Sequence, residues 1–234
     1  MKRSTILWGL ISLFIGLGFF WSCDDNDDDY SLDRYYQSIV TVESDSTSDA
    51  YWLQMTNGDL LWPVNQGFLP FYNFQKGERG LATYNIVGGA DGKFTNLIRL
   101  ISMSEILTKD IIKWTPANKD TLALANWNPG VIKDGWIENG FINLIFEFRW
   151  HNKAHIVNLV QNDTITPAPV NPQGGVWSLQ FCQNSNGDWI EHGSVVRSLV
   201  SFKIPSSINT SSLTKVNIEY VNWNGQRLNY AITS

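Results

Sequence analysis

The residues best suited to metal binding in this sequence are its three histidines, His151, His155 and His192. His151 and His155 lie on either side of a predicted hairpin turn, so their imidazole rings can approach each other and supply two metal ligands. A zinc site in a protein needs three or four ligands, and the sequence places no further ligand beside this pair. We therefore predict no metal site and no cofactor.

Carboxylates are the second group that could do chemistry. Hydrolysis of a glycosidic bond requires two acidic side chains at a set separation. Nothing in the sequence pairs any two of the candidates, which are Glu138, Glu147, Asp188 and Glu191. The motifs Gly-x-Ser-x-Gly and His-Glu-x-x-His are absent, and the glycine-rich segment 88–93 lacks the Gly-Lys-Ser/Thr ending of a phosphate-binding loop. The sequence thus predicts no catalytic residues and a protein that is not an enzyme.

Tryptophan is the residue type that could carry binding. The chain has 11 tryptophans; exposed aromatic rings can stack on sugar faces, whereas buried ones fill β cores. Trp127, Trp136 and Trp189 lie beside Asn, Gly or Asp in turn-like contexts, which makes them the candidates for stacking on a ligand. Trp52 and Trp150 occupy core-like positions in strand patterns. The alternative to ligand binding is that the tryptophans, taken together, fill the β cores.

The N-terminus is typical of an exported protein. Residues 2–3 are basic and residues 6–21 form an uncharged apolar run that spans only about 24 Å as a helix, too short for a membrane core of roughly 30 Å. We interpret residues 1–22 as a lipoprotein signal peptide, after which Cys23 receives the lipid anchor; the alternative is an ordinary secreted protein. The second cysteine, Cys182, is then left without a disulfide partner, and its apolar-alternating context predicts a buried thiol.

An acidic run follows Cys23 directly, and residues 23–31 are expected to form a tether. The run comprises Asp24, Asp25, Asn26, Asp27, Asp28 and Asp29. It either serves as a plain solvated spacer or acts as a sorting signal, because it resembles the acidic export signal of surface lipoproteins in Bacteroidota-type bacteria. The net charge of the chain is −5 and much of it lies in this run, so the folded part is nearly neutral. The folded part therefore lacks the excess of Lys and Arg that nucleic-acid binding requires.

Beyond residue 31 the patterns indicate β structure throughout. Four Asn-Gly pairs flanked by alternating apolar residues predict hairpins with type I′ turns; they are Asn57-Gly58, Asn139-Gly140, Asn186-Gly187 and Asn224-Gly225. The alternation over 141–150 predicts a half-buried strand. The sequence also allows one short helix at 102–109.

Two domains are expected. The segment 113–128 has a linker-like composition between two strand-rich regions, so we place an OB-like β-barrel domain at 32–112 and a β-sandwich domain at 117–234. The proline-containing segment 161–175 is predicted to wrap over the second domain as a loop.

Several short segments resemble the NigD-like family of exported lipoproteins. Besides Cys23 with its acidic run, these are residues 57–63 (NGDLLWP), 77–87, 106–110 (ILTKD), 141–144 (FINL), 155–160 (HIVNLV) and 199–202 (LVSF). The resemblance implies an N-terminal OB-like β-barrel followed by a C-terminal β-sandwich, which agrees with the all-β patterns. The family name derives from a bacteriocin-associated locus, and an immunity role has been supposed. No catalytic residues come with the family.

The expected function is that of an outer-membrane lipoprotein that faces the cell exterior and acts as a non-catalytic interaction or bacteriocin-associated immunity protein. Its partners would be the outer membrane, through the lipid anchor, and an unknown protein or glycan. The alternative is a glycan-binding module of a polysaccharide-uptake system, which requires an exposed pair of stacked tryptophans. An enzyme would instead require a cleft with converging titratable groups. OB-like barrels often bind nucleic acids, but acidic residues outnumber basic ones in this half of the chain, which argues against such a ligand.

Overall fold

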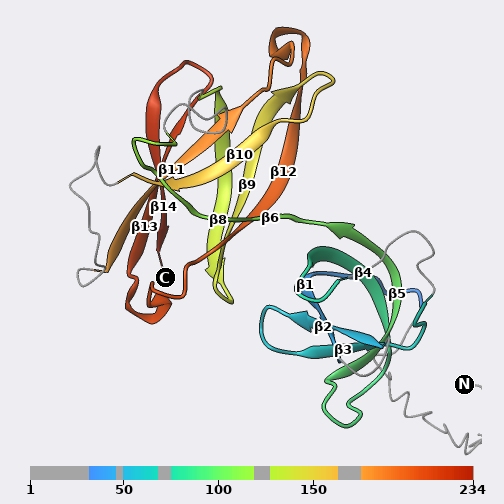
Figure 1. Ribbon diagram of the computed structural model, residues 1–234. Helices are drawn as coiled ribbons and strands as arrows, with labels where there is room; N and C mark the ends of the chain where they lie inside the picture. The colour runs from blue at the N-terminus through green and yellow to red at the C-terminus, as the bar shows by residue number, and fades with distance from the viewer. Residues whose placement is uncertain (1–31, 46–49, 68–74, 119–126, 163–174, 234) are drawn as a thin grey trace, which may run out of the picture.

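The computed structural model describes residues 32–45, 50–67, 75–118, 127–162 and 175–233. Within them the chain forms a β-barrel followed by a β-sandwich (Figure 1), which confirms the predicted fold class. The signal peptide, Cys23 and the acidic run lie outside the described residues. No helix formed by the described residues is long and apolar enough to cross a membrane.

Five strands close the barrel in the order β1-β2-β3-β5-β4. They are β1 (Tyr36–Ser44), β2 (Tyr51–Met55), β3 (Leu60–Pro63), β4 (Arg79–Gly88) and β5 (Asn96–Glu105). β3 and β5 pair in parallel, while β4 pairs with both β1 and β5 in the antiparallel sense and closes the barrel. Alternate residues point inward, so Val40, Leu53 and Leu61 are fully buried in the barrel core.

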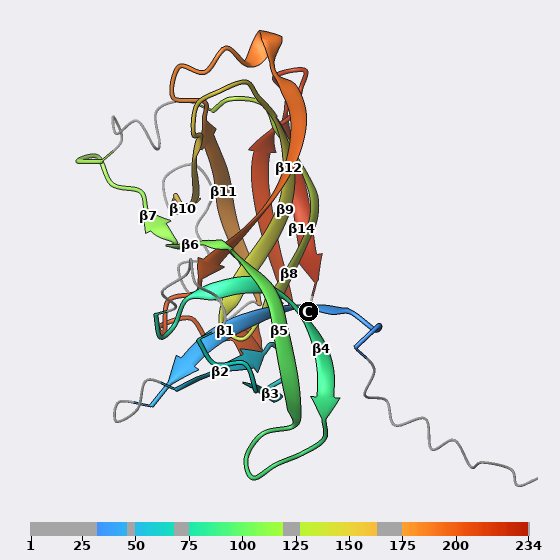
Figure 2. The same ribbon diagram turned by 90° about the vertical axis from the view of Figure 1, so that its right-hand side faces the viewer.

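The sandwich contains a five-stranded sheet, β14-β13-β11-β10-β7, and a four-stranded sheet, β6-β12-β9-β8 (Figure 2). Its strands are β6 (Leu107–Asp110), β7 (Ile112–Lys113), β8 (Gly130–Glu138), β9 (Phe141–Trp150), β10 (Ile156–Gln161), β11 (Val176–Asn184), β12 (Ser194–Lys203), β13 (Lys215–Val221) and β14 (Arg227–Thr233). Two short 3-10 helices, η2 (Ile190–His192) and η3 (Thr210–Ser212), precede β12 and β13. The predicted strand 141–150 is confirmed as β9, whose Ile142, Leu144 and Phe146 pack in the core with Trp177.

Three of the four Asn-Gly pairs form hairpin turns. Asn139-Gly140 joins β8 to β9 with positive φ at both residues (47° and 78°), as a type I′ turn requires. In the pairs at 57–58 and 224–225 only the glycine has positive φ, so these hairpins have longer loops. The fourth pair, Asn186-Gly187, follows β11 but does not form a hairpin, because the next strand, β12, belongs to the other sheet.

The two domains are joined by nearly continuous strand. After β5 the chain passes through Ile106 into β6, which pairs in parallel with β12, and then into β7, which pairs in parallel with β10. All of β6 and the first residue of β7 lie within 32–112, the segment that we assigned to the barrel domain, yet pairing places both strands at the edges of the two sandwich sheets. The helix considered at 102–109 is wrong, because pairing with β4 and β12 holds these residues extended.

Arg79, the first residue of β4, is buried where the barrel meets the sandwich, with 2% of its surface exposed. Its guanidinium carbon lies 4.1 Å from the centroid of the Phe141 ring, and its Nη1 donates to Asn143 Oδ1 at 3.1 Å. The same Asn143 oxygen accepts from Ser201 Oγ at 2.7 Å. Burial lowers the pKa of Arg79, and the charge of Glu138 partly offsets this. Arg79 therefore links the barrel to the sandwich through its contacts with Phe141 and Asn143.

Replacing Arg79 by Ala is expected to loosen this junction. The variant loses a charge-assisted hydrogen bond and a desolvated cation–π contact, so the free energy of unfolding should fall by about 2–4 kcal/mol. Differential scanning calorimetry should show a lower Tm, and small-angle X-ray scattering should show a larger radius of gyration. The exposed Arg99 on β5 provides the control, because Arg99→Ala should change stability by less than about 0.5 kcal/mol. Unchanged scattering from Arg79→Ala would show that the domains are held by other contacts.

Candidate functional site at the distal end of the sandwich

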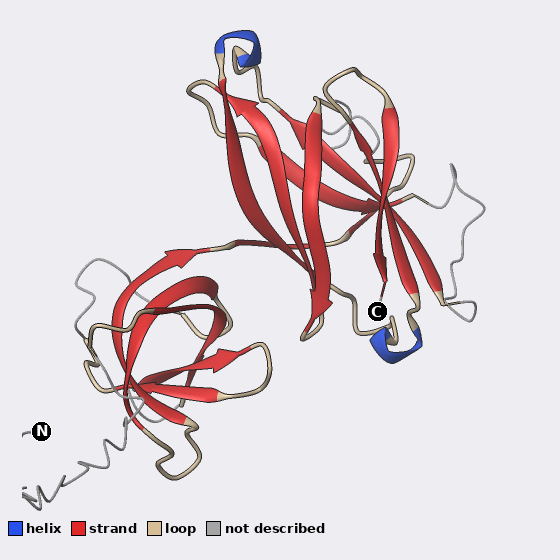
Figure 3. Cartoon of the chain, turned by 180° about the vertical axis from the view of Figure 1, so that it is seen from behind, coloured by secondary structure: helices blue, strands red, loops and turns tan. Residues whose placement is uncertain are grey.

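An aromatic patch is exposed at the end of the sandwich that lies away from the barrel. Trp189 precedes η2 and is 71% exposed, Trp150 ends β9 and is 43% exposed, and Trp223 in the β13–β14 turn is 39% exposed. We call these three residues, together with Arg149 and His192, the distal patch. Figure 3 shows η2 as the helix at the top of the sandwich, with the barrel at the opposite end.

The strands of the sandwich set the position of the distal patch. β9 begins beside the barrel at Phe141, whose ring contacts Arg79, and its ten residues span roughly 30 Å to Trp150. The Arg149 guanidinium lies 5.9 Å from the centroid of the Trp223 ring, and Trp189 and His192 have ring centroids 6.1 Å apart. Tryptophan and arginine are the residues most enriched in the energetic centres of protein interfaces.

A buried carboxylate holds the loops beneath the patch. Asp188 accepts hydrogen bonds from the backbone N–H groups of His151 at 2.8 Å, Asn152 at 3.0 Å and Trp189 at 3.0 Å. His155 Nε2 lies 3.1 Å from Asp188 Oδ2, and His155 Nδ1 lies 2.8 Å from Gln183 Nε2. Because an amide nitrogen only donates, Nδ1 accepts and Nε2 carries the proton. The network ties the β9–β10 turn to the segment that presents Trp189.

The Asp188 carboxylate should make the stability of this end depend on pH. Its burial raises the pKa, but the backbone N–H groups of His151 and Asn152 and the bond from His155 outweigh burial and hold the pKa well below the usual range. A carboxylate with a lowered pKa in the folded state stabilises the fold above its unfolded value, near pH 4, and this stabilisation is lost as the pH falls further.

We expect Asp188→Asn to be less stable than the native chain at pH 6, and the difference to shrink between pH 4 and pH 2. Urea unfolding followed by tryptophan fluorescence at several pH values measures this. Glu147, whose pKa is lowered by Arg197 on the sheet surface, is present in both chains, so its contribution cancels in the comparison. If the difference in unfolding free energy between the two chains stayed the same at every pH, the role given to Asp188 would be contradicted.

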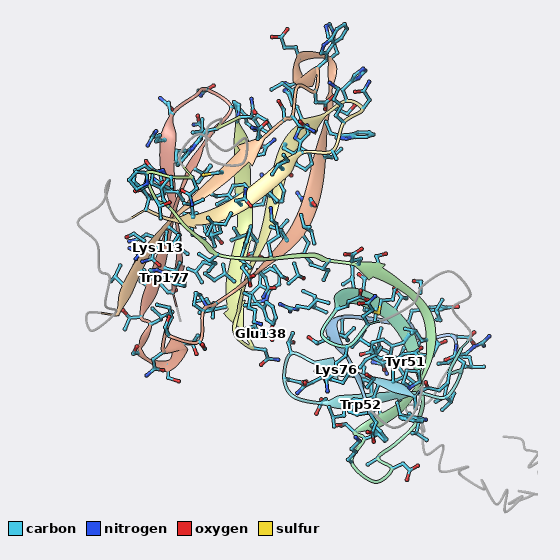
Figure 4. All side chains as sticks on the ribbon, viewed as in Figure 1. Tyr51, Trp52, Lys76, Lys113, Glu138 and Trp177 are labelled. Atoms are coloured by element: carbon cyan, nitrogen blue, oxygen red, sulfur yellow. The ribbon has the colours of Figure 1, made fainter. Side chains whose placement is uncertain are left out.

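The three tryptophans predicted to stack on a ligand lie at separate places. Trp189 belongs to the distal patch. Trp127, before β8, is half-buried and has the Arg227 guanidinium 4.8 Å from its ring centroid. Trp136 lies on β8 and donates from Nε1 to Glu138 Oε2 at 3.1 Å. Glu138 lies near the end of the sandwich that faces the barrel (Figure 4). No ring contact joins any two of the three.

Trp136 lines an open cleft of about 540 Å³ between β8 and β14. The other side of this cleft is formed by Thr210 and Ser211 of η3 and by residues of β14 from Tyr230 onward. The Tyr230 hydroxyl lies 3.4 Å from Asp134 Oδ1, and burial, then the Asp134 charge, raises the pKa of Tyr230. The cleft therefore presents hydroxyl groups, an indole and the Glu138 carboxylate.

Two further candidates for chemistry, Glu147 and His155, are engaged in structural contacts. Glu147 forms ion pairs with Arg197 at 2.7 Å and Lys133 at 3.5 Å. Both ring nitrogens of His155 are occupied, so the approach to His151 that we considered for a metal does not supply free ligands. Across the described parts of the chain, no three His, Cys, Asp or Glu side chains are grouped closely enough to hold a metal ion.

Cys182 is a free thiol with 2% of its surface exposed, as predicted from its strand pattern. It packs with Val160 in a small cluster covered by Trp114 and Trp127. Burial, with a contribution from Glu219, raises the pKa of the Cys182 thiol to about 12. Since the thiolate is the reactive form, Cys182 is not a nucleophile at neutral pH.

Sequence reasoning missed part of the distal patch. Trp150 was expected in the core because it continues the alternation of β9, and this is wrong. The pairing between β8 and β9 ends at Gly130 and Phe148, so Trp150, although it still pairs with Ser194 of β12, extends beyond β8 and is exposed. Trp52 was also expected in the core but is half-buried outside the barrel core. The exposure of Trp223 could have been predicted, because this residue directly precedes the Asn224-Gly225 turn.

Comparison with family models gives two matches. Residues 39–100 match the NigD-like N-terminal OB domain, and residues 110–234 match the NigD-like C-terminal beta sandwich domain. The second match alone covers more than half of the chain and begins at Asp110, the last residue of β6. A comparison with curated proteins gives no match.

Solved structures share the two-domain fold. A Bacteroides vulgatus protein of unknown function is 26% identical, with 86% of this chain and 91% of that chain covered and a TM-score of 0.69. A Bacteroides fragilis protein assigned as a lipoprotein is 12% identical, with coverages of 86% and 98% and a TM-score of 0.63. A NigD-like immunity protein from Bacteroides caccae is 16% identical, with coverages of 84% and 91% and a TM-score of 0.56. At these two lower identities the likeness concerns the fold alone.

Proposed function

Because the chain belongs to the NigD-like family, we propose that it is a non-catalytic outer-membrane lipoprotein that faces the cell exterior and binds a protein partner through the distal patch. The role that fits is of the immunity type, in which the bound partner is a bacteriocin or its target. The name of the Bacteroides caccae neighbour supports this role, and the name of the Bacteroides fragilis neighbour supports lipid anchoring.

The observation that carries the proposal is the exposure of three tryptophans at one end of the sandwich. Soluble domains seldom expose large aromatic residues together unless they bind something. Trp150, Trp189 and Trp223 are all exposed large apolar residues of the described chain, and the Asp188 network holds the segments that present Trp150 and Trp189. Exposed tryptophans with an arginine beside them suit a protein interface better than a small-molecule site.

The path of the chain supports an outward-facing patch. The described chain enters the fold at Leu32, just before β1 of the barrel, and the distal patch lies at the far end of the sandwich (Figures 1 and 3). A lipid on Cys23 followed by a short acidic tether would hold the barrel near the membrane. The distal patch would then project away from the surface, where a large partner can reach it.

The proposed immunity-type role can be tested in a related bacterium that is killed by a bacteriocin-producing neighbour. Expression of the native chain should raise survival in contact with the producer, and the variant with Trp150, Trp189 and Trp223 all changed to Ser should not. A matched control changes two exposed apolar residues outside the patch, Val64 and Leu107, to Ser; it should protect like the native chain. Equal protection by all three chains would exclude the distal patch as the binding surface.

The glycan-binding alternative is less well supported. It requires two exposed tryptophans with parallel rings, and Trp127, Trp136 and Trp189 are too dispersed to form such a pair. The cleft beside Trp136 combines an indole with several hydroxyl groups. A glycan array would support this alternative if binding were lost in Trp136→Ala and retained in Trp189→Ala.

A further inference from the structure

A second aromatic cluster lies on the barrel, far from the distal patch. It consists of Trp52 on β2, Trp62 on β3, and Lys93 and Phe94 in the β4–β5 loop, and we call it the barrel patch. The Phe94 ring centroid lies 4.7 Å from that of Trp62 and 6.2 Å from that of Trp52. Lys93 Nζ lies 3.5 Å from the centroid of the Trp52 ring. Figure 4 shows Trp52 on the barrel domain.

The barrel core does not require these rings. Leu53 and Leu61 point into the barrel and pair with each other, so the adjacent residues Trp52 and Trp62 point outward. The same register places Trp52 opposite Trp62 on the outer surface. Both indoles and the Phe94 ring are half-exposed and belong to none of the buried clusters of the described residues. Two tryptophans on the outside of a small barrel call for an explanation other than core packing.

The loop that supplies Lys93 and Phe94 is held in place. Asp91 and Phe94 exchange two backbone hydrogen bonds, of 3.1 and 3.0 Å, around a turn in which Gly92 has φ +57°. Thr95 N donates to Leu60 O at 2.7 Å, and Thr95 Oγ1 donates to Asp59 Oδ1 at 3.3 Å. The glycine-rich segment 88–93 is therefore part of a turn that fixes a cation and an aromatic ring against β2 and β3.

The charges around the barrel patch restrict its ligand. No described carboxylate lies within ion-pair distance of Lys93. Glu43, which lies opposite Trp52 in the pairing of β1 with β2, forms its ion pair with Lys76 instead, at 3.8 Å. Lys93 can thus take one carboxylate from a ligand. Asp59 and Asp91 lie in the two adjoining turns, and their charges would repel a chain of phosphates.

We propose that the barrel patch binds a saccharide that carries a single carboxylate, such as a hexuronic or sialic acid at the end of a neutral glycan. The apolar C–H face of the sugar ring lies on the Trp62 and Phe94 rings, and the Lys93 ammonium takes the carboxylate. In barrels of this topology the β2–β3 face and the β4–β5 loop form the surface that receives oligosaccharides and oligonucleotides. This ligand is separate from the protein partner of the distal patch, and neither proposal depends on the other.

Isothermal titration of the whole folded chain with 3′-sialyllactose, a glucuronic-acid-terminated disaccharide and lactose tests the proposal. At least one acidic saccharide should bind about tenfold or more tightly than lactose. Trp62→Ala should weaken that binding about tenfold or more, as the loss of one stacking surface does. Lys93→Met should bring the acidic saccharide to the affinity of lactose. Trp189→Ala, which removes an equally large ring from the distal patch, should leave the titration unchanged.

Three results would overturn the proposal. One is the absence of saturable binding of either acidic saccharide up to millimolar concentrations. Another is binding that survives Trp62→Ala in a variant whose circular dichroism and Tm match the native chain. The third is tighter binding of an oligothymidylate, which would assign the patch to single-stranded nucleic acid.

Discussion

Replacing Cys23 by Ala is expected to abolish lipid anchoring in the outer membrane. An acylated N-terminal cysteine buries several hydrocarbon chains at about 0.8 kcal/mol per methylene, which makes attachment effectively permanent. No helix among the described residues could cross a membrane in its place. Without the thiol no lipid can be added, so the chain should either appear in the soluble fraction or accumulate with residues 1–22 still attached. Cell fractionation with immunoblotting measures the distribution, and intact mass measures the processing.

Cys182→Ala is the matched control for this experiment. Cys182 is buried in the sandwich and plays no part in anchoring, so the variant should stay with the outer membrane. If the Cys23→Ala chain is processed and still sediments with the outer membrane, the lipoprotein assignment fails.

Removing the charges of the acidic run should trap the protein on the periplasmic face of the outer membrane. A spacer works with any hydrophilic composition, whereas a signal that is recognised through its charge needs the carboxylates themselves. Asparagine keeps the length and the solvation of the run while it removes five negative charges. The change to Asn is made at Asp24, Asp25, Asp27, Asp28 and Asp29. Lipidation and folding should be unaffected.

Proteinase K added to intact cells distinguishes the two roles of the run. The native protein should be digested and the asparagine variant protected. A second variant with Glu at the same five positions keeps the charge and should behave like the native chain. If all three chains are digested equally, the run is only a spacer; if all three are protected, the native protein faces the periplasm.

Local patterns in the sequence predicted individual strands well. The alternation over 141–150 matches β9 with the same bounds, because ten residues of period two leave only one way to bury the apolar set. The hairpins at Asn139-Gly140 and Asn224-Gly225 were predictable for the same reason, since the turn chemistry is local. The sheet that each strand joins was less predictable. Asn186-Gly187 has the backbone of a tight turn, but long-range pairing sends the next strand to the other sheet.

Features that arise where distant segments meet could not be predicted. Arg79 shows in the sequence only as a charged residue before a strand; its burial follows from the docking of Phe141 and Asn143 against the barrel. The sequence indicated Trp189 as exposed through its turn-like context. The sequence did not show that β9 extends past the end of β8 at Trp150. The residues around Trp150 carry no information about where the neighbouring strand β8 ends.

The central claim is that the distal patch is displayed on the outside of the cell, and one labelling experiment tests it most directly. Glu191 is exposed in η2 beside Trp189, so Glu191→Cys introduces a thiol at the patch. Because Cys23 would carry lipid and burial raises the pKa of Cys182 to about 12, the new thiol should be the one that reacts. A membrane-impermeant maleimide should label Glu191→Cys on intact cells as completely as after lysis, and should leave the native chain unlabelled in both. Labelling of Glu191→Cys only after the outer membrane is permeabilised would contradict the proposed function.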